Sequence, residues 1–170
     1  MNNTETLSKM KELRLHGMHE YFNNALETGL IYDCKIDNFI SQLVEAEYDD
    51  RSDRKIQRLI KNAKFRMISQ IEDIKYNADR NLNKRQITKI CNLKWLKDGE
   101  NIIITGFTGT GKTFISCAIG LKACMHGFRV EYYSFNKLFY ELKYSKSCGN
   151  YLKRFEKLLK SKSLLKSEIL

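Results

Sequence analysis

The sequence predicts an α/β protein in which an all-helical N-terminal module precedes a parallel-sheet domain. Apolar residues recur at helical spacing through most of the first hundred positions. A short apolar run, Ile102 to Thr105, then leads into a glycine-rich turn and another helical pattern. Strand-forming residues, Arg129 to Ser134, follow that helix, as in a βαβ unit. The predicted boundaries are 1–67 for the helical module, 68–98 for a linker and connecting helix, and 99–170 for the sheet domain.

The helical module is predicted from two amphipathic patterns. The first spans Thr4 to Thr28, with Thr4 as its N-cap and Gly29 ending it. The second starts at an N-cap, Asp37, and runs to Met67; it allows one helix, or two with a break near residues 50–53. Residues 68–82 are rich in Asn and Asp and predict an irregular linker. Residues 83–94 return to helix, and Trp95 is expected in the core.

The glycine-rich turn fits the phosphate-loop pattern G-x-x-x-x-G-K-[ST]. Backbone N–H groups can converge on phosphates only where the turn is tight, which glycine permits, and the following helix adds its positive dipole end. The Lys112 ammonium would reach the β- and γ-phosphates of ATP, and the Thr113 hydroxyl would ligate Mg²⁺. The predicted nucleotide-binding residues are Gly106, Phe107, Thr108, Gly109, Thr110, Gly111, Lys112 and Thr113. A glycine-rich turn that binds nothing is the alternative, and the agreement of strand, spacing and helix argues against it.

Four further elements are predicted after the loop. A helix runs from Lys112 to about Met125 and is stopped by Gly127. The strand at 129–134 would be the second parallel strand of the βαβ unit. A helix over 137–144, a loop over 145–150 and a basic amphipathic helix over 151–162 complete the pattern.

Charge and composition favour a polyanionic partner. The 170 residues include 30 Lys and Arg against 20 Asp and Glu, a formal charge of +10. A basic stripe at spacings of three and four suits a DNA backbone as well as it suits a solvated helix face; it comprises Arg51, Arg54, Lys55, Arg58, Lys61 and Lys64, of which the last five are the candidate nucleic-acid-binding residues. No apolar run approaches a membrane span, and the N-terminus has no signal-type stretch, so a cytoplasmic location is expected. Five cysteines without a C-x-x-C pair favour reduced, buried thiols over zinc.

Several segments together resemble one family. They are the stretch Lys11 to Met18, the basic helix around Arg54 to Arg66, Leu93 to Leu96 with Gly99 to Asn101 before the loop, and residues 118–121 and 126–130. In these the chain resembles the IstB-like ATP-binding proteins, transposition helpers of bacterial insertion sequences that are related to the DnaC helicase loaders and belong to the AAA+ class. The resemblance implies an N-terminal module that contacts transposase or DNA, and an ATPase domain that oligomerises on DNA.

The chain departs from the family pattern near residue 165. The family has an apolar strand that ends in paired acids, which hold Mg²⁺ and position the attacking water. Here Leu164 and Leu165 are followed by Lys166 and Ser167, and Glu168 is a poor substitute. We therefore expect a C-terminally truncated, incomplete P-loop NTPase domain of AAA+ type that binds ATP but hydrolyses it poorly. The strand at 102–105 would then have few or no parallel partners.

Two other functions remain open at this point. In one, the chain is a non-enzymatic fragment that binds DNA or a transposase and carries a vestigial nucleotide loop. In the other it is a small P-loop kinase or nucleotide transferase, which is disfavoured because no acceptor-site or lid motif is visible. DNA is the expected partner, with a transposase or further copies of the chain as additional candidates, and no membrane partner is expected.

Overall fold

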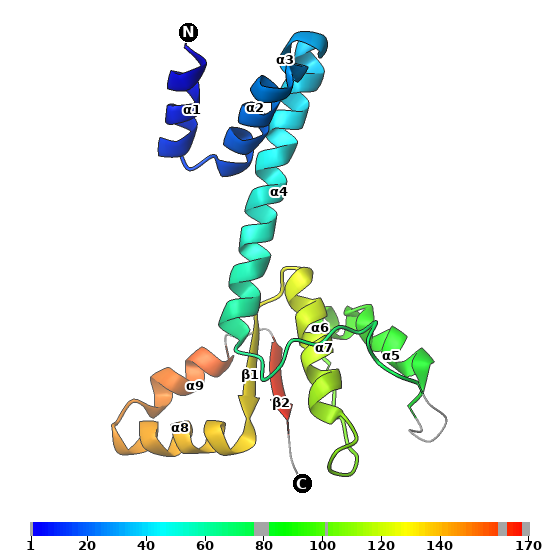
Figure 1. Cartoon of the computed structure of the whole chain (residues 1–170). Coiled ribbons are helices and arrows are strands. Elements are labelled where there is room, and N and C mark those ends of the chain that lie inside the picture. The colour runs from blue at the N-terminus through cyan, green and yellow to red at the C-terminus, as the bar shows by residue number, and fades with distance from the viewer. Residues whose placement is uncertain (1, 77–81, 101, 160–162, 168–170) are drawn as a thin grey trace. The chain divides into compact units, whose positions relative to one another are not determined.

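The computed structural model describes residues 2–76, 82–100, 102–159 and 163–167 (Figure 1). Its contacts divide the chain into two compact units, Met1–Lys55 and Ile56–Leu170. The predicted boundaries at residues 67 and 98 rest on sequence pattern alone and stay predictions. No helix in the described part of the chain is both long and apolar enough to cross a membrane.

The N-terminal unit contains α1 (Asn3–Glu12), α2 (His16–Thr28), α3 (Leu30–Asp33) and the beginning of α4 (Ile36–Ala63). The single helix predicted over 4–28 is wrong, because the chain turns between α1 and α2 with Arg14 at a φ of 58°. The cap of α1 is the Asn2 side chain, which accepts from the Thr4 N–H at 3.4 Å. Gly29, at a φ of 74°, ends α2 as predicted. Because α4 begins at Ile36, Asp37 lies in its first turn instead of capping it.

The break between α1 and α2 allows the start of α2 to approach α4 closely. A Cβ atom at Gly17 would lie 2.2 Å from the Ala46 carbonyl oxygen, so only glycine fits between the two backbones. The neighbouring Glu47 is buried, and its carboxylate accepts from the Met18 N–H at 3.3 Å. The N-cap residue of α2 itself, Leu15, makes no side-chain hydrogen bond to the start of the helix. Glu47 therefore caps α2 from another helix.

The electrostatics of Glu47 support this capping role. Burial by itself raises the pKa of the Glu47 carboxyl, but the hydrogen bonds from Arg51 and from the start of α2 outweigh it and leave the pKa below its ordinary value of 4.5. The Arg51 Nε lies 2.6 Å from the carboxylate. The pairing contributes stability at neutral pH, and this contribution is lost as the pH falls below 4.5 and through the lowered pKa of the folded state.

Helix α4 runs without interruption through the stretch where the sequence allowed a break. Ion pairs one helical turn apart join Glu47 to Arg51 and Asp50 to Arg54, each at 2.6 Å. Such pairs stabilise a helix by a few tenths of a kcal/mol each, roughly 0.2–0.5. Asp37 near the start and Lys61 near the end also suit the helix dipole.

The second unit is built around α7 (Lys112–Met125). The other elements are the end of α4, α5 (Lys84–Cys91), α6 (Lys94–Asp98), β1 (Val130–Ser134), α8 (Phe135–Ser147), α9 (Tyr151–Leu159) and β2 (Ser163–Ser167). Strands β1 and β2 pair in parallel, from Val130 opposite Ser163 to Ser134 opposite Ser167. Helix α7 contacts both strands and α5. The unit thus places a parallel strand pair against a central helix, which agrees in part with the predicted α/β class.

The predicted strands are found in part. The strand expected at 129–134 is confirmed as β1, and Leu164 and Leu165 lie in β2. The strand predicted over 102–105 is wrong, because these residues pair with no strand in the described part of the chain. The irregular stretch after residue 67 is confirmed for residues 68–76. Helix α8 extends to Ser147, beyond the predicted end at 144, and residues 160–162 of the last predicted helix lie outside the described residues.

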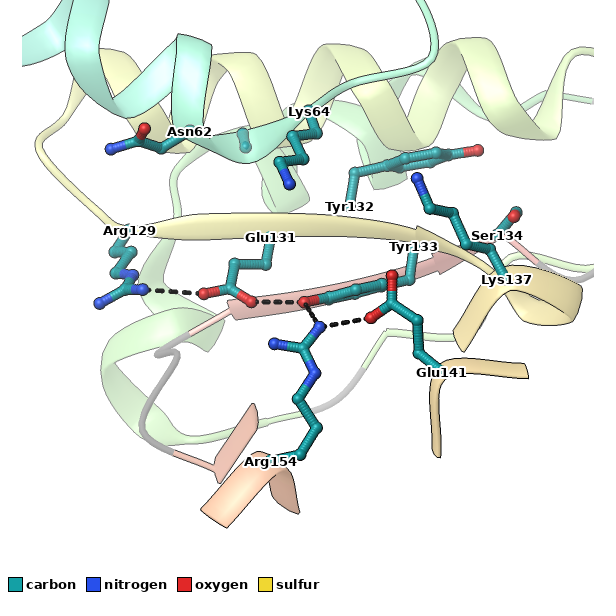
Figure 2. Close-up of a pocket in the computed structure, with 11 residues that line it drawn as sticks. Asn62, Lys64, Arg129, Glu131, Tyr132, Tyr133, Ser134, Lys137, Glu141 and Arg154 are labelled. Carbon is teal, nitrogen blue, oxygen red and sulfur yellow. Dashed lines mark hydrogen bonds and ion pairs between the residues drawn. The ribbon is translucent and has the colours of Figure 1, made fainter. Parts of the chain in front are cut away.

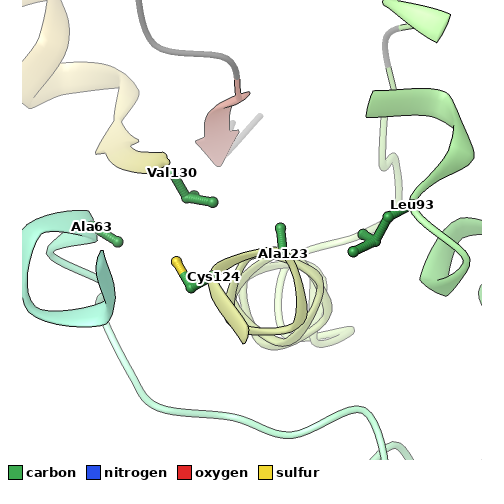
Figure 3. Packing of buried hydrophobic residues seen from close by; sticks show 5 residues of the cluster. All are labelled: Ala63, Leu93, Ala123, Cys124 and Val130. Atoms are coloured by element: carbon green, nitrogen blue, oxygen red, sulfur yellow. The ribbon is translucent and has the colours of Figure 1, made fainter. Parts of the chain in front are cut away.

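The core of the second unit consists of two apolar clusters that share α7. One joins Ala123 and Cys124 of α7 to Ala63, Leu93 and Val130 (Figure 3). The other joins Ile115 and Ile119 of α7 to Ile74 and Ile87. Trp95 packs against both clusters and donates its indole N–H to the Ile90 carbonyl at 2.8 Å, which confirms its predicted place in the core.

All five cysteines are free, but only Cys117 and Cys124 of α7 are buried as predicted; Cys34 and Cys91 are half-buried and Cys148 is exposed. Burial raises the pKa of the Cys124 thiol to about 11, although the backbone at Val130 partly opposes the shift. Cys124 therefore acts as a small apolar side chain in the core.

The close approach at Gly17 predicts the effect of its replacement. Gly17→Ala forces α2 away from α4 and lowers the free energy of unfolding of the N-terminal unit by about 1–3 kcal/mol. Urea denaturation followed by far-UV circular dichroism measures the loss. The exposed α2 residue Asn24 provides the matched control: Asn24→Ala should leave stability unchanged or slightly raised. Equal stability of Gly17→Ala and the parent chain would contradict the described packing.

Candidate nucleotide site

The glycine-rich turn adopts backbone conformations that only glycine adopts easily. Gly109 and Gly111 have φ values of 83° and 89°, in the left-handed region. A Cβ atom at Gly106 would lie 3.0 Å from the Thr110 hydroxyl oxygen. These positions are the reason for the glycine spacing, because they let the chain reverse sharply at the start of α7.

The turn leaves backbone donors at the start of α7. Gly111 is the N-cap residue and has no side chain with which to cap the helix. No acceptor within the described residues meets the N–H groups of Gly111, Lys112 and Thr113. Unpaired N–H groups at a helix N-terminus, together with the helix dipole, favour an anion. The predicted site residues therefore come together as a turn with its donors at the end of one helix.

Lys112 brings a positive charge to the same turn. Its ammonium donates to the carbonyl oxygens of Gly106, at 2.5 Å, and Phe107, at 2.8 Å. The Thr110 hydroxyl donates to the same Phe107 carbonyl at 2.8 Å. The lysine thus folds back onto the loop that precedes it, which keeps one cation at the turn.

The remaining predicted loop residues are open to solvent. Phe107 is 88% exposed, so it does not contribute to the core, and Thr108 and Gly109 are exposed as well. Thr113 is half-buried in the first turn of α7. Because most of the loop backbone is exposed, a ligand can reach it directly from solvent.

Two serine hydroxyls bind carbonyl groups in the first turn of α7. The Ser116 hydroxyl donates to the Lys112 carbonyl at 2.9 Å, and the buried Ser69 donates to the Phe114 carbonyl at the same distance. Ser69 lies in the irregular segment that follows α4, in a region that sequence reasoning treated only as a linker. The only signal for this contact in the sequence was a small hydroxyl residue, Ser69, next to the apolar Ile68.

The five predicted DNA-binding residues are all exposed. Arg54 pairs with Asp50 at 2.6 Å, so part of its charge is compensated. Lys55, Arg58 and Lys61 lie on α4, whereas Lys64 follows the helix at a φ of 55°. Lys64 therefore does not continue the helical stripe that the spacing predicts.

Sequence reasoning missed a network of charged and aromatic side chains on β1, α8 and α9 (Figure 2). Glu131 accepts from Arg129 at 2.9 Å and from the Tyr133 hydroxyl at 2.8 Å. Arg154 donates to that hydroxyl at 3.0 Å and to Glu141 at 2.5 Å. The scarcity of acidic residues after Asn101 could have drawn attention to Glu131 and Glu141.

The described residues contain no group of three or more His, Cys, Asp or Glu side chains that could hold a metal ion. Mg²⁺ commonly takes several ligands from nucleotide phosphates and water. Thr113 offers one hydroxyl for this purpose.

Comparison with known proteins confirms the resemblance found in the sequence. The family model described as "IstB-like ATP binding protein" matches residues 8–169. A protein of Pseudomonas fluorescens, named as an ATP-binding protein of insertion sequence IS1162, is 29% identical over 94% of this chain and 70% of its own length. An insertion-sequence ATP-binding protein of Sinorhizobium fredii, y4pL, is 30% identical over 86% of this chain. One of Geobacillus stearothermophilus, from IS5376, is 26% identical over 92% of it.

The chain corresponds to only part of these relatives. The matched regions make up 60% of the Sinorhizobium protein and 62% of the Geobacillus protein. The shared region includes the glycine-rich loop and the helical segments on both sides of it, since the family match spans nearly all of the 170 residues.

Proposed function

Because the chain belongs to the family of IstB-like ATP-binding proteins, we propose that it binds ATP at Gly106–Thr113 and assembles on DNA with a transposase. The observation that carries the proposal is the turn itself. Glycines at positive φ expose the N–H groups at the start of α7 beside the Lys112 ammonium. This arrangement suits the phosphates of a nucleoside triphosphate.

In this proposal the triphosphate and its metal ion are bound by three kinds of group: backbone N–H groups, one ammonium and one hydroxyl. The N–H groups of Gly111, Lys112 and Thr113 bind phosphate oxygens, and the Lys112 ammonium moves from the loop carbonyls to the β- and γ-phosphates. The Thr113 hydroxyl would hold Mg²⁺, which would offset part of the phosphate charge. The bound nucleotide then controls assembly of the protein on DNA.

DNA binding is supported by the exposed cations of α4. Lys55, Arg58 and Lys61 lack ion-pair partners among the described residues, so their charge is available to phosphates. The insertion-sequence names of the relatives favour DNA and a transposase as partners for this chain too. Contacts of this kind are independent of DNA sequence and depend on salt.

Slow hydrolysis is the expected property of the 170-residue polypeptide. Hydrolysis needs carboxylates that position water and metal. Leu164 and Leu165 of β2 are followed by Lys166 and Ser167, where the family pattern has paired acids. We therefore propose that these residues bind ATP and turn it over poorly.

One observation favours a second candidate function. Residues 102–105, which lead into the loop, have no strand partner among the described residues, and Ile103 is 84% exposed. A loop with so little support on one side suits a non-enzymatic protein that binds DNA or a transposase and whose nucleotide loop is vestigial. ATP binding separates the two functions.

Lys112→Ala removes the only side-chain cation within the loop. ATP affinity should fall about tenfold or more, because a charge-assisted contact to the phosphates is lost. Titration of a fluorescent ATP analogue in the presence of Mg²⁺ measures the dissociation constant. Lys122→Ala, a matched change further along α7, should bind like the parent chain. If the parent chain is folded and does not bind ATP, the vestigial-loop function holds instead.

Steady-state turnover tests the expected slow hydrolysis. Phosphate release by the 170-residue polypeptide with ATP, Mg²⁺ and duplex DNA should stay close to that of the Lys112→Ala variant, because the paired acids are absent from the β2 pattern. A turnover well above that variant would refute this part of the proposal and place the catalytic carboxylates elsewhere in these residues.

The salt dependence of DNA binding tests the cations of α4. Arg58→Gln with Lys61→Gln should weaken binding and reduce the slope of log affinity against log salt by about one unit per lost phosphate contact. Fluorescence anisotropy with labelled duplex DNA across a salt series gives the slope. The control, Lys11→Gln with Lys35→Gln, removes the same charge from exposed positions elsewhere. If both double variants lose the same DNA affinity, the effect comes from net charge alone, and specific phosphate contacts by the α4 cations are contradicted.

A further inference from the structure

A cavity of about 430 Å³ lies beside β1, away from the nucleotide loop (Figure 2). Its walls come from Asn62 to Lys64 at the end of α4, from β1 and the adjoining Arg129, and from residues of α8 and α9. None of the residues Gly106–Thr113 lines it. Its volume is within the range of roughly 300–1,000 Å³ that is usual for small-ligand sites.

On one side of β1 the charges of the cavity are compensated. Glu131 accepts from Arg129 and Tyr133, and Glu141 accepts from Arg154. Burial, followed by the neighbouring Glu131 carboxylate, raises the pKa of Tyr133, so its hydroxyl remains a donor. Each carboxylate thus has an arginine partner, and neither presents an unopposed negative charge to a ligand.

On the other side of β1 two lysines have no such partner. Figure 2 shows the Lys64 and Lys137 side chains on the same side of the strand as Tyr132, away from Glu131 and Tyr133. Neither ammonium makes an ion pair or hydrogen bond with any described residue. The positive φ of Lys64 takes it out of the helical stripe and places it at the cavity. The excess of two positive charges in the lining is therefore located on Lys64 and Lys137.

We propose that Lys64 and Lys137 bind a phosphate group in the cavity beside β1. An ammonium is a compact charge with three donors and is well suited to phosphate oxygens. The two carboxylates of the lining are paired with arginines on the other side of β1, so they do not compete with a ligand for the two lysines. The phosphate is carried by a small phosphate ester or by the backbone of a nucleic acid, and it binds separately from ATP at the loop.

Binding of inorganic pyrophosphate in a Lys112→Ala background tests the site without the nucleotide loop. Isothermal titration should give a saturable signal, and Lys64→Gln with Lys137→Gln should weaken it by about tenfold or more. The pair Lys64→Arg with Lys137→Arg keeps the charge and should restore binding. The matched control, Lys143→Gln with Lys153→Gln, removes two exposed lysines of α8 and α9 outside the cavity and should bind like the background chain.

The same variants identify the source of the phosphate. If it belongs to a nucleic acid, the glutamine pair lowers duplex-DNA affinity more than the control pair, and pyrophosphate competes with DNA. If it belongs to a small ester, pyrophosphate binding is lost while DNA affinity matches that of the control pair. The proposal is overturned if the folded Lys112→Ala chain binds neither probe, or if both glutamine pairs weaken pyrophosphate equally. ATP binding by the parent chain is measured separately, so its failure would not affect this result.

Discussion

The burial of α7 is the constraint on which the rest of the second unit depends. From Ile115 to Cys124 every residue except Lys122 is buried, and the helix lies between the strand pair, α5 and the irregular segment after α4. A helix that is apolar on nearly all sides must be covered on nearly all sides. This packing fixes the orientation of the helix, and thereby the orientation of the glycine-rich turn that precedes its N-terminus. The exposed loop therefore owes its orientation to apolar contacts that lie further along the same helix.

Local sequence patterns predicted the structure of the glycine-rich turn and of the helix after it better than they predicted the structure around them. The glycine spacing, the helix from Lys112 and the stop at Gly127 were all readable, because each is determined within a few residues. The break at Arg14 was not readable from the helical pattern; it precedes the close approach of Gly17 to Ala46, a contact between positions almost thirty residues apart. The Glu47 cap and the Ser69 contact have the same cause: a side chain on one segment satisfies backbone groups of another.

The strands show a second limit of sequence patterns. Residues 102–105 have the composition of a strand, and their burial alternates, since Ile104 packs on the core while Ile103 is 84% exposed. Residue composition and alternating burial reflect only where a segment's own side chains lie. A strand also needs a neighbouring strand that supplies backbone hydrogen bonds. The parallel partner of β1 is instead β2, thirty-three residues further along in register. The pairing of strands is a non-local property that no single segment encodes.

The hydrogen bond from Ser69 to the Phe114 carbonyl has a consequence for how the loop can respond to a ligand. It ties the first turn of α7 to the segment that follows α4, whereas Gly109 and Gly111 hold the loop at positive φ values that glycine adopts without strain. The contact resists a displacement of the helix start, so an anion that reshapes the loop would do so at least cost through the torsions of these glycines.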